Sequence, residues 1–73
     1  SGFRQSDSLG LTKRELDVIS LLAEGLTSSR VAERLSISQA TVQAHIRNAM
    51  GKTGSSNRTA LVASVLAHGA IDI

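Results

Sequence analysis

Two long polar side chains, Gln43 and Arg47, stand four positions apart in a segment that is otherwise rich in small residues. If Val42 points toward a core, a rotation of about 100° per residue puts these residues on the opposite side: Ala40, Gln43, Ala44, Arg47 and Gly51. Arginine can donate two hydrogen bonds to guanine, and glutamine can form two hydrogen bonds with adenine. The methyl group of alanine can make an apolar contact with the methyl group of thymine. The small residues let the helix backbone approach closely within a groove of duplex DNA. The pattern therefore predicts that Gln43, Ala44 and Arg47 read bases.

The flank of the same segment carries groups suited to phosphate oxygens, namely Thr41, His45 and Asn48. Hydrogen bonds to phosphate fix a protein on the duplex without reading its sequence. The alternative interpretation is an ordinary solvated helix, but such faces usually carry many Glu and Lys side chains, and this one carries no acid.

Charge is distributed unevenly along the chain, whose net charge is +2. Residues 1–33 hold four basic and five acidic residues, a net charge of −1. Residues 34–71 hold four basic residues and no acid, a net charge of +4. A basic, acid-free half suits a surface that faces phosphates, although charge alone would also fit a solvated surface.

Four helical segments must position these groups, and no alternating strand pattern occurs. The first begins at Thr12, where Thr12 and Glu15 form a capping box, and ends at Gly25. Thr27 caps a short second helix, which has Val31, Ala32 and Leu35 on its apolar side and Ser28, Ser29, Arg30 and Glu33 elsewhere.

The third helix is capped by Ser38 and runs to about Gly51, with an apolar stripe of Val42, Ile46, Ala49 and Met50. A polar loop over residues 52–56 and a fourth helix, from Asn57 to Gly69, follow. The fold class is therefore all-α, a compact four-helix bundle that contains a helix-turn-helix over residues 27–46. Residues 1–10 read as a flexible linker or tail, and residues 11–73 as one domain.

Short segments spread over residues 11–71 carry a resemblance to a known family. They are Leu11–Glu15, Leu22–Thr27, Val31–Leu35, Ile37–Ser38, Thr41–Val42, His45, Asn48–Met50, Lys52 and Arg58–Thr59. At this spacing they resemble the LuxR/GerE (NarL/FixJ-like) DNA-binding domains. The resemblance implies a transcriptional regulator with its recognition helix, about residues 39–51, in the major groove of double-stranded DNA. Family members occur alone or as output domains of response regulators and quorum sensors.

The resemblance also assigns roles by position. Gln43, Ala44 and Arg47 match base-reading positions. The positions expected at the DNA backbone, or capping beside it, are Thr27, Ser28, Ser29, Ser38, Gln39, Thr41, His45, Asn48, Lys52 and Arg58. The chain departs from the family where Lys is frequent, at Ser29, Ala40 and Gln43, and where a basic residue is common, at Gly51. Ser36 replaces a frequent Gly, and Thr53 and Ser55 replace apolar residues.

The last helix is expected to form a homodimer that binds an inverted repeat, through Leu61, Val62, Val65 and Leu66. The alternative is a module used mainly for protein–protein interaction or dimerisation. A different alternative, an enzyme, is not favoured, because no spacing joins a nucleophile, a base and an acid, and because His45 and His68 suit surface or capping positions.

The sequence lacks the patterns typical of cofactor sites, metal sites and membrane-spanning segments. The chain has no cysteine, no P-loop and no cluster of metal ligands, so we expect no cofactor, no metal and no small-molecule ligand. No apolar run approaches the roughly 20 residues that span a bilayer. We therefore expect no membrane contact and a cytosolic protein, and the resemblance to the LuxR/GerE family implies the bacterial cytoplasm.

Overall fold

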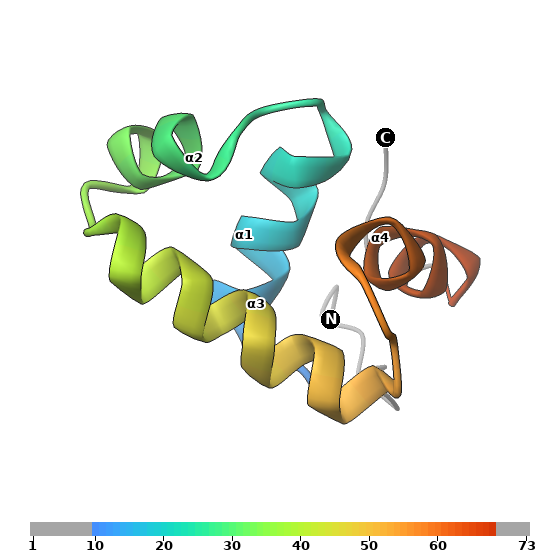
Figure 1. Cartoon of the computed structure of the whole chain (residues 1–73). Coiled ribbons are helices and arrows are strands. Elements are labelled where there is room, and N and C mark those ends of the chain that lie inside the picture. Colours follow the sequence, from blue (N-terminus) through green and yellow to red (C-terminus); the bar gives the residue numbers. More distant parts are fainter. Residues whose placement is uncertain (1–9, 69–73) are drawn as a thin grey trace, which may run out of the picture.

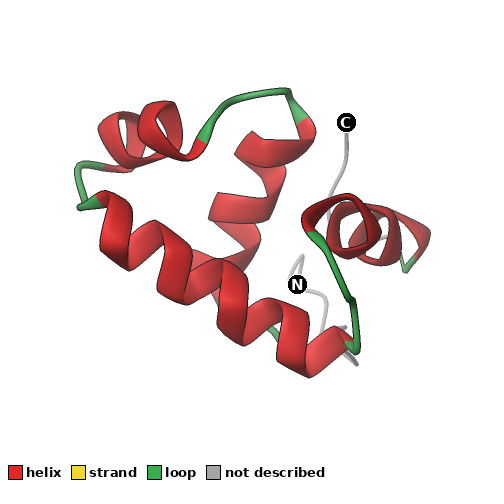
Figure 2. Cartoon of the chain, viewed as in Figure 1, coloured by secondary structure: helices red, strands yellow, loops and turns green. Residues whose placement is uncertain are grey.

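The computed structural model describes residues 10–68, and these form four helices without a strand. The helices are α1 (Lys13–Ala23), α2 (Ser28–Leu35), α3 (Gln39–Thr53) and α4 (Arg58–Ala67). Short connections join them, as Figure 2 shows in green. The predicted all-α, four-helix class is confirmed. Gly69 and all of the predicted tail except Gly10 lie outside the described residues.

Each helix begins where the sequence places a capping residue. The side-chain oxygens of Thr12, Thr27, Ser38 and Asn57 each accept a hydrogen bond from the backbone N–H three residues later, at 2.8–3.2 Å. Each bond satisfies one of the N–H groups that a helix start leaves without a partner. At Thr12 the capping box is complete, since the Thr12 N–H also donates to Oε1 of Glu15 at 2.9 Å.

Helix ends depend on residues in the left-handed region. Gly54 (φ 71°) ends α3, and Gly25 (φ 98°) follows α1. The helix α3 continues to Thr53, two residues beyond the approximate end predicted at Gly51, so Lys52 belongs to the helix rather than to the following loop. The hydroxyl group of Thr53 donates to the Ala49 carbonyl at 3.0 Å and lies 2.7 Å from the Ser55 hydroxyl. Thr53 and Ser55, which replace apolar residues of the family, therefore form a hydrogen bond with each other.

Aliphatic side chains from all four helices form one core. Its fully buried members are Val18, Ile19, Val31, Val42, Ala49, Leu61 and Val65. Leu26, Leu35 and Ile37 pack against the core from the connections and the end of α2. In Figure 1, α3 runs along one edge, α2 lies beside its start, α4 lies near its end, and α1 passes behind. The packing therefore leaves one long side of α3 uncovered.

Candidate nucleic-acid interface

The outward side of α3 carries the side chains that sequence analysis singled out for base reading. Val42, Ile46 and Ala49 face the core, which turns the opposite side to solvent. Gln43 and Arg47 are exposed there, and Ala44 between them is half-buried. Ala40 and Gly51 are also exposed and add little bulk. The two long side chains thus stand above a low surface that another molecule can approach.

A tight turn sets the angle between α2 and α3. Ser36 adopts a left-handed conformation (φ 58°), and the N–H of Ile37 donates to the Ala32 carbonyl at 3.0 Å. The Ile37 side chain packs against the core. This is the arrangement of a helix-turn-helix, in which one short helix supports the next.

A hydrogen bond joins the two helices of this unit. Nε2 of Gln43 donates to Oγ of Ser28 at 3.1 Å. Ser28 is only 9% exposed, so its hydroxyl lies inside the structure and not on the solvated side of α2. This corrects the expectation that Ser28 lies away from the packed side of α2, whereas its expected place at the DNA backbone stays a prediction. The sequence pattern missed the pair because the two residues are separated by the whole turn.

Most of the other residues predicted at the DNA backbone are exposed: Thr27, Ser29, Ser38, Gln39, Thr41, Asn48, Lys52 and Arg58. His45 is half-buried. The hydroxyl groups of Thr27 and Ser38 already accept the capping bonds, and Ser38 Oγ is also 2.9 Å from the Thr41 hydroxyl. These hydroxyl groups gather at the starts of α2 and α3, where helix N-termini attract anions.

Lys52 has an internal partner that the sequence pattern did not reveal. Its Nζ lies 2.8 Å from Oε1 of Glu15, whose side chain is 4% exposed. Burial raises the pKa of the Glu15 carboxyl, but hydrogen bonds from Lys52 and Thr12, together with the charges of Lys52 and His45, outweigh burial and lower it below 4.5. The basic half of the sequence is therefore not free of acid in space, and Lys52 contributes less positive charge to the surface than expected.

Arg58 extends the exposed side of α3 toward α4. It lines a hollow of about 350 Å³ with Gln43, Ile46, Arg47 and Met50. Two guanidinium groups therefore border a hollow whose floor includes the apolar side chains Ile46 and Met50. Sequence periodicity gave no sign of this hollow, because Arg58 belongs to the next helix.

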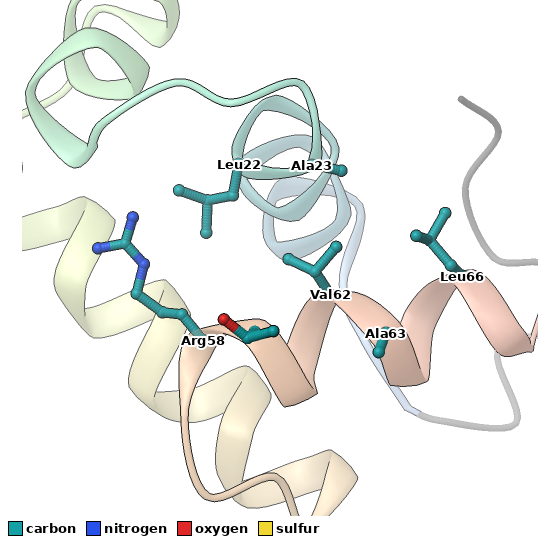
Figure 3. Close-up of a pocket in the computed structure, with 7 residues that line it drawn as sticks. Leu22, Ala23, Arg58, Val62, Ala63 and Leu66 are labelled. Carbon is teal, nitrogen blue, oxygen red and sulfur yellow. The ribbon is translucent and has the colours of Figure 1, made fainter.

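The surface predicted for dimerisation is smaller than expected. Leu61 and Val65 are fully buried in this domain, so they cannot also contact a second copy, and their assignment to an interface was wrong. Val62 is half-buried and Leu66 is 38% exposed. These two line a groove of about 390 Å³ between α4 and the end of α1, where Figure 3 shows Leu22 and Ala23 opposite them.

Two further observations concern the described part of the chain, residues 10–68. There, no group of three or more His, Cys, Asp or Glu side chains is arranged to hold a metal ion. Within the same range, no helix has the length and apolar character needed to cross a membrane.

Comparisons with known proteins agree with this geometry. Residues 9–65 match the family model described as bacterial regulatory proteins, luxR family. The chain is 41% identical over 63 residues to the spore germination protein GerE of Bacillus subtilis, covering 86% of this chain and 85% of GerE. It is 47% identical over 58 residues to the transcriptional regulatory protein LiaR of the same species, covering 80% of this chain but 26% of LiaR.

A solved structure of the transcription factor GerE superposes with a TM-score of 0.83 at 34% identity, covering 89% of this chain and 96% of that one. The family model spans most of the described residues and includes α1, α2, α3 and most of α4. The chain therefore belongs to the luxR family of bacterial regulatory proteins, as a DNA-binding domain of transcriptional regulators and not an enzyme.

Proposed function

We propose that the domain binds a specific duplex sequence by placing α3 in the major groove. The observation that supports this most directly is the exposed pair Gln43 and Arg47 on a side of α3 that is otherwise small and free of acid. Arg47 would donate to guanine and Gln43 would pair with adenine, while Ala44 would contact a thymine methyl group. The exposed N-terminal residues of α2 and α3, with Arg58, would contact phosphates on either side.

Few basic side chains support this contact, so a single domain should bind weakly. Arg47 and Arg58 border the hollow beside α3, whereas Lys52 is paired with Glu15. Each phosphate neutralised lowers the logarithm of the affinity by about 0.9 per tenfold rise in salt. With Arg58 at phosphate and Arg47 at a base, the expected salt slope is roughly −1 for each domain. Positive charge alone cannot supply tight binding.

A dimer on an inverted repeat would provide the missing affinity. The groove at Val62 and Leu66 offers apolar surface on α4, where Leu66 is the one large apolar residue of the described chain that is exposed. If both recognition helices enter one face of the duplex, the half-site centres lie about 10 base pairs apart or a multiple of that. The names of LiaR and GerE, a transcriptional regulatory protein and a transcription factor, support regulation of transcription as the outcome, and a bacterial cytoplasmic location follows from it.

Selection of binding sites from random duplex DNA tests the proposal in one experiment. The expected result is an enriched inverted repeat with half-sites at the stated spacing. The matched control is Gln43→Ala with Arg47→Ala, which keeps the capping and core residues and should enrich no motif. If the parent chain enriches no motif and instead self-associates, the interaction-module alternative replaces the proposal.

A further inference from the structure

Ser28 and Gln43 connect the core of the helix-turn-helix to its outward face. Nε2 of Gln43 donates to Oγ of Ser28 at 3.1 Å. Among the side-chain hydrogen bonds found within residues 10–68, this is the only one between α2 and α3. Ser28 is buried at the first residue of α2, and Gln43 is exposed on α3. The buried hydroxyl group of Ser28 therefore holds the amide of Gln43, which lies on the proposed base-reading side of α3.

The bond limits what the Gln43 amide can offer to a base. A glutamine amide has one oxygen acceptor and two N–H donors. Guanine presents two acceptors in the major groove, N7 and O6, whereas adenine presents one acceptor, N7, and one donor, the N6 amino group. When Ser28 accepts one N–H, the amide keeps one donor and one acceptor. That remaining pair matches adenine and lacks the second donor that guanine requires.

We infer that Ser28 is a positioning residue that restricts Gln43 to adenine. The inference rests on the proposed function, because it requires α3 to read bases. Holding the amide before DNA arrives also lowers the cost of ordering a flexible side chain on binding. Ser28 thus contributes to specificity from inside the protein, although it touches no base.

The test measures base preference in the whole 73-residue chain. Gln43→Ala first identifies the base pair whose preference depends on this side chain. At that pair, the affinities of the parent and of Ser28→Ala are measured for adenine and guanine. We expect the adenine preference of the parent to fall about fivefold or more in Ser28→Ala, since one base contact contributes discrimination of this order.

Two matched variants separate the hydrogen bond from general effects. Ser28→Thr keeps a hydroxyl group and should retain the adenine preference. Ser29→Ala removes the neighbouring exposed hydroxyl, which is proposed to contact phosphate, so it should lower the affinity for adenine and guanine sites alike and leave their ratio unchanged. In a Gln43→Ala background, Ser28→Ala should have no further effect on base preference, because the two residues act as one unit.

The side-chain amide resonances of Gln43 give a readout without DNA. We expect them to shift in Ser28→Ala and to stay near their parent positions in Ser29→Ala. An unchanged adenine-to-guanine ratio in Ser28→Ala, or a parent that prefers guanine at this pair, overturns the inference and leaves the proposed function standing. A parent chain that enriches no motif overturns the proposed function, and this inference with it.

Discussion

The ammonium group of Lys52 lies 2.8 Å from the carboxylate of Glu15, which joins the last turn of α3 to the first turn of α1. The same carboxylate oxygen accepts the N–H of Thr12 at 2.9 Å and completes the capping box. One buried acid therefore caps a helix and ties together two helices that are far apart in the sequence. Protonation of Glu15 would weaken both contacts.

The stability of the domain should accordingly depend on pH through Glu15. Because the folded state lowers the pKa of this carboxyl below 4.5, its contribution is fully present above that value. It is lost as the pH falls through the lower folded pKa. Urea unfolding between pH 6 and pH 3 should show this decline. At pH 6, Glu15→Gln should reduce the free energy of unfolding by about 1–3 kcal/mol.

Glu24→Gln is the matched control for this prediction, because Glu24 is an exposed acid at the end of the same helix. It should keep the acid-dependent decline of the parent, whereas Glu15→Gln should show a shallower one. Equal slopes for the parent and Glu15→Gln would contradict the role assigned to this carboxylate.

The relationship also shows which features could be predicted from the sequence. The caps at Thr12, Thr27, Ser38 and Asn57 were predictable, since each is a contact between residues three positions apart. The Lys52–Glu15 and Gln43–Ser28 contacts span 37 and 15 positions and depend on how the helices pack. A sequence pattern identifies helix faces, but it does not say which residue of another helix meets each face.

The fourth helix illustrates the same limit. The apolar residues of α4 were predictable from their helical spacing. That spacing does not show which of them are buried in the core and which lie at the surface. The structure buries Leu61 and Val65 and leaves only part of the surface of Val62 and Leu66 accessible. Substitutions of the buried residues should therefore lower stability, and substitutions of the accessible residues should affect association.

Leu61→Ala should lower the free energy of unfolding by about 2–5 kcal/mol, because it leaves a cavity in the core. Leu66→Asp should change stability by only about 0.5 kcal/mol, as a surface substitution does. It should nevertheless prevent dimer formation on an inverted repeat, measured by sedimentation in the presence of duplex DNA. Ala67→Asp adds the same charge at an exposed position that does not line the groove and should leave the dimer intact. A dimer that persists in Leu66→Asp would exclude this groove as the interface.

Ser36 offers a site for stabilisation. It is the only residue other than glycine with positive φ in the described part of the chain, at 58°. The left-handed conformation costs roughly 1–2 kcal/mol for a residue with a Cβ atom, and glycine avoids most of this cost but loses more backbone entropy on folding. Ser36→Gly should therefore raise the free energy of unfolding by about 0.5 kcal/mol and the Tm by about 2–4 °C.

Ser56→Gly provides the comparison, because Ser56 is an exposed loop residue without positive φ. It loses backbone entropy with no strain to relieve, so its Tm should stay the same or fall. A Tm for Ser36→Gly that falls as far as that of Ser56→Gly would mean that the turn before α3 stores no strain.

Arg47→Ala tests base reading with little risk to the fold, because the Arg47 side chain is exposed and lies opposite the buried stripe of α3. Loss of a two-bond contact to guanine should weaken binding by about 1–3 kcal/mol and relax the preference at one base pair. Arg34→Ala removes an equal charge from the exposed end of α2. Arg34→Ala should lower the affinity for every DNA sequence slightly and by the same factor. The difference between the two variants then measures base recognition separately from the loss of charge. If both variants reduce affinity equally for every sequence, Arg47 acts as a phosphate contact and another residue must read that base.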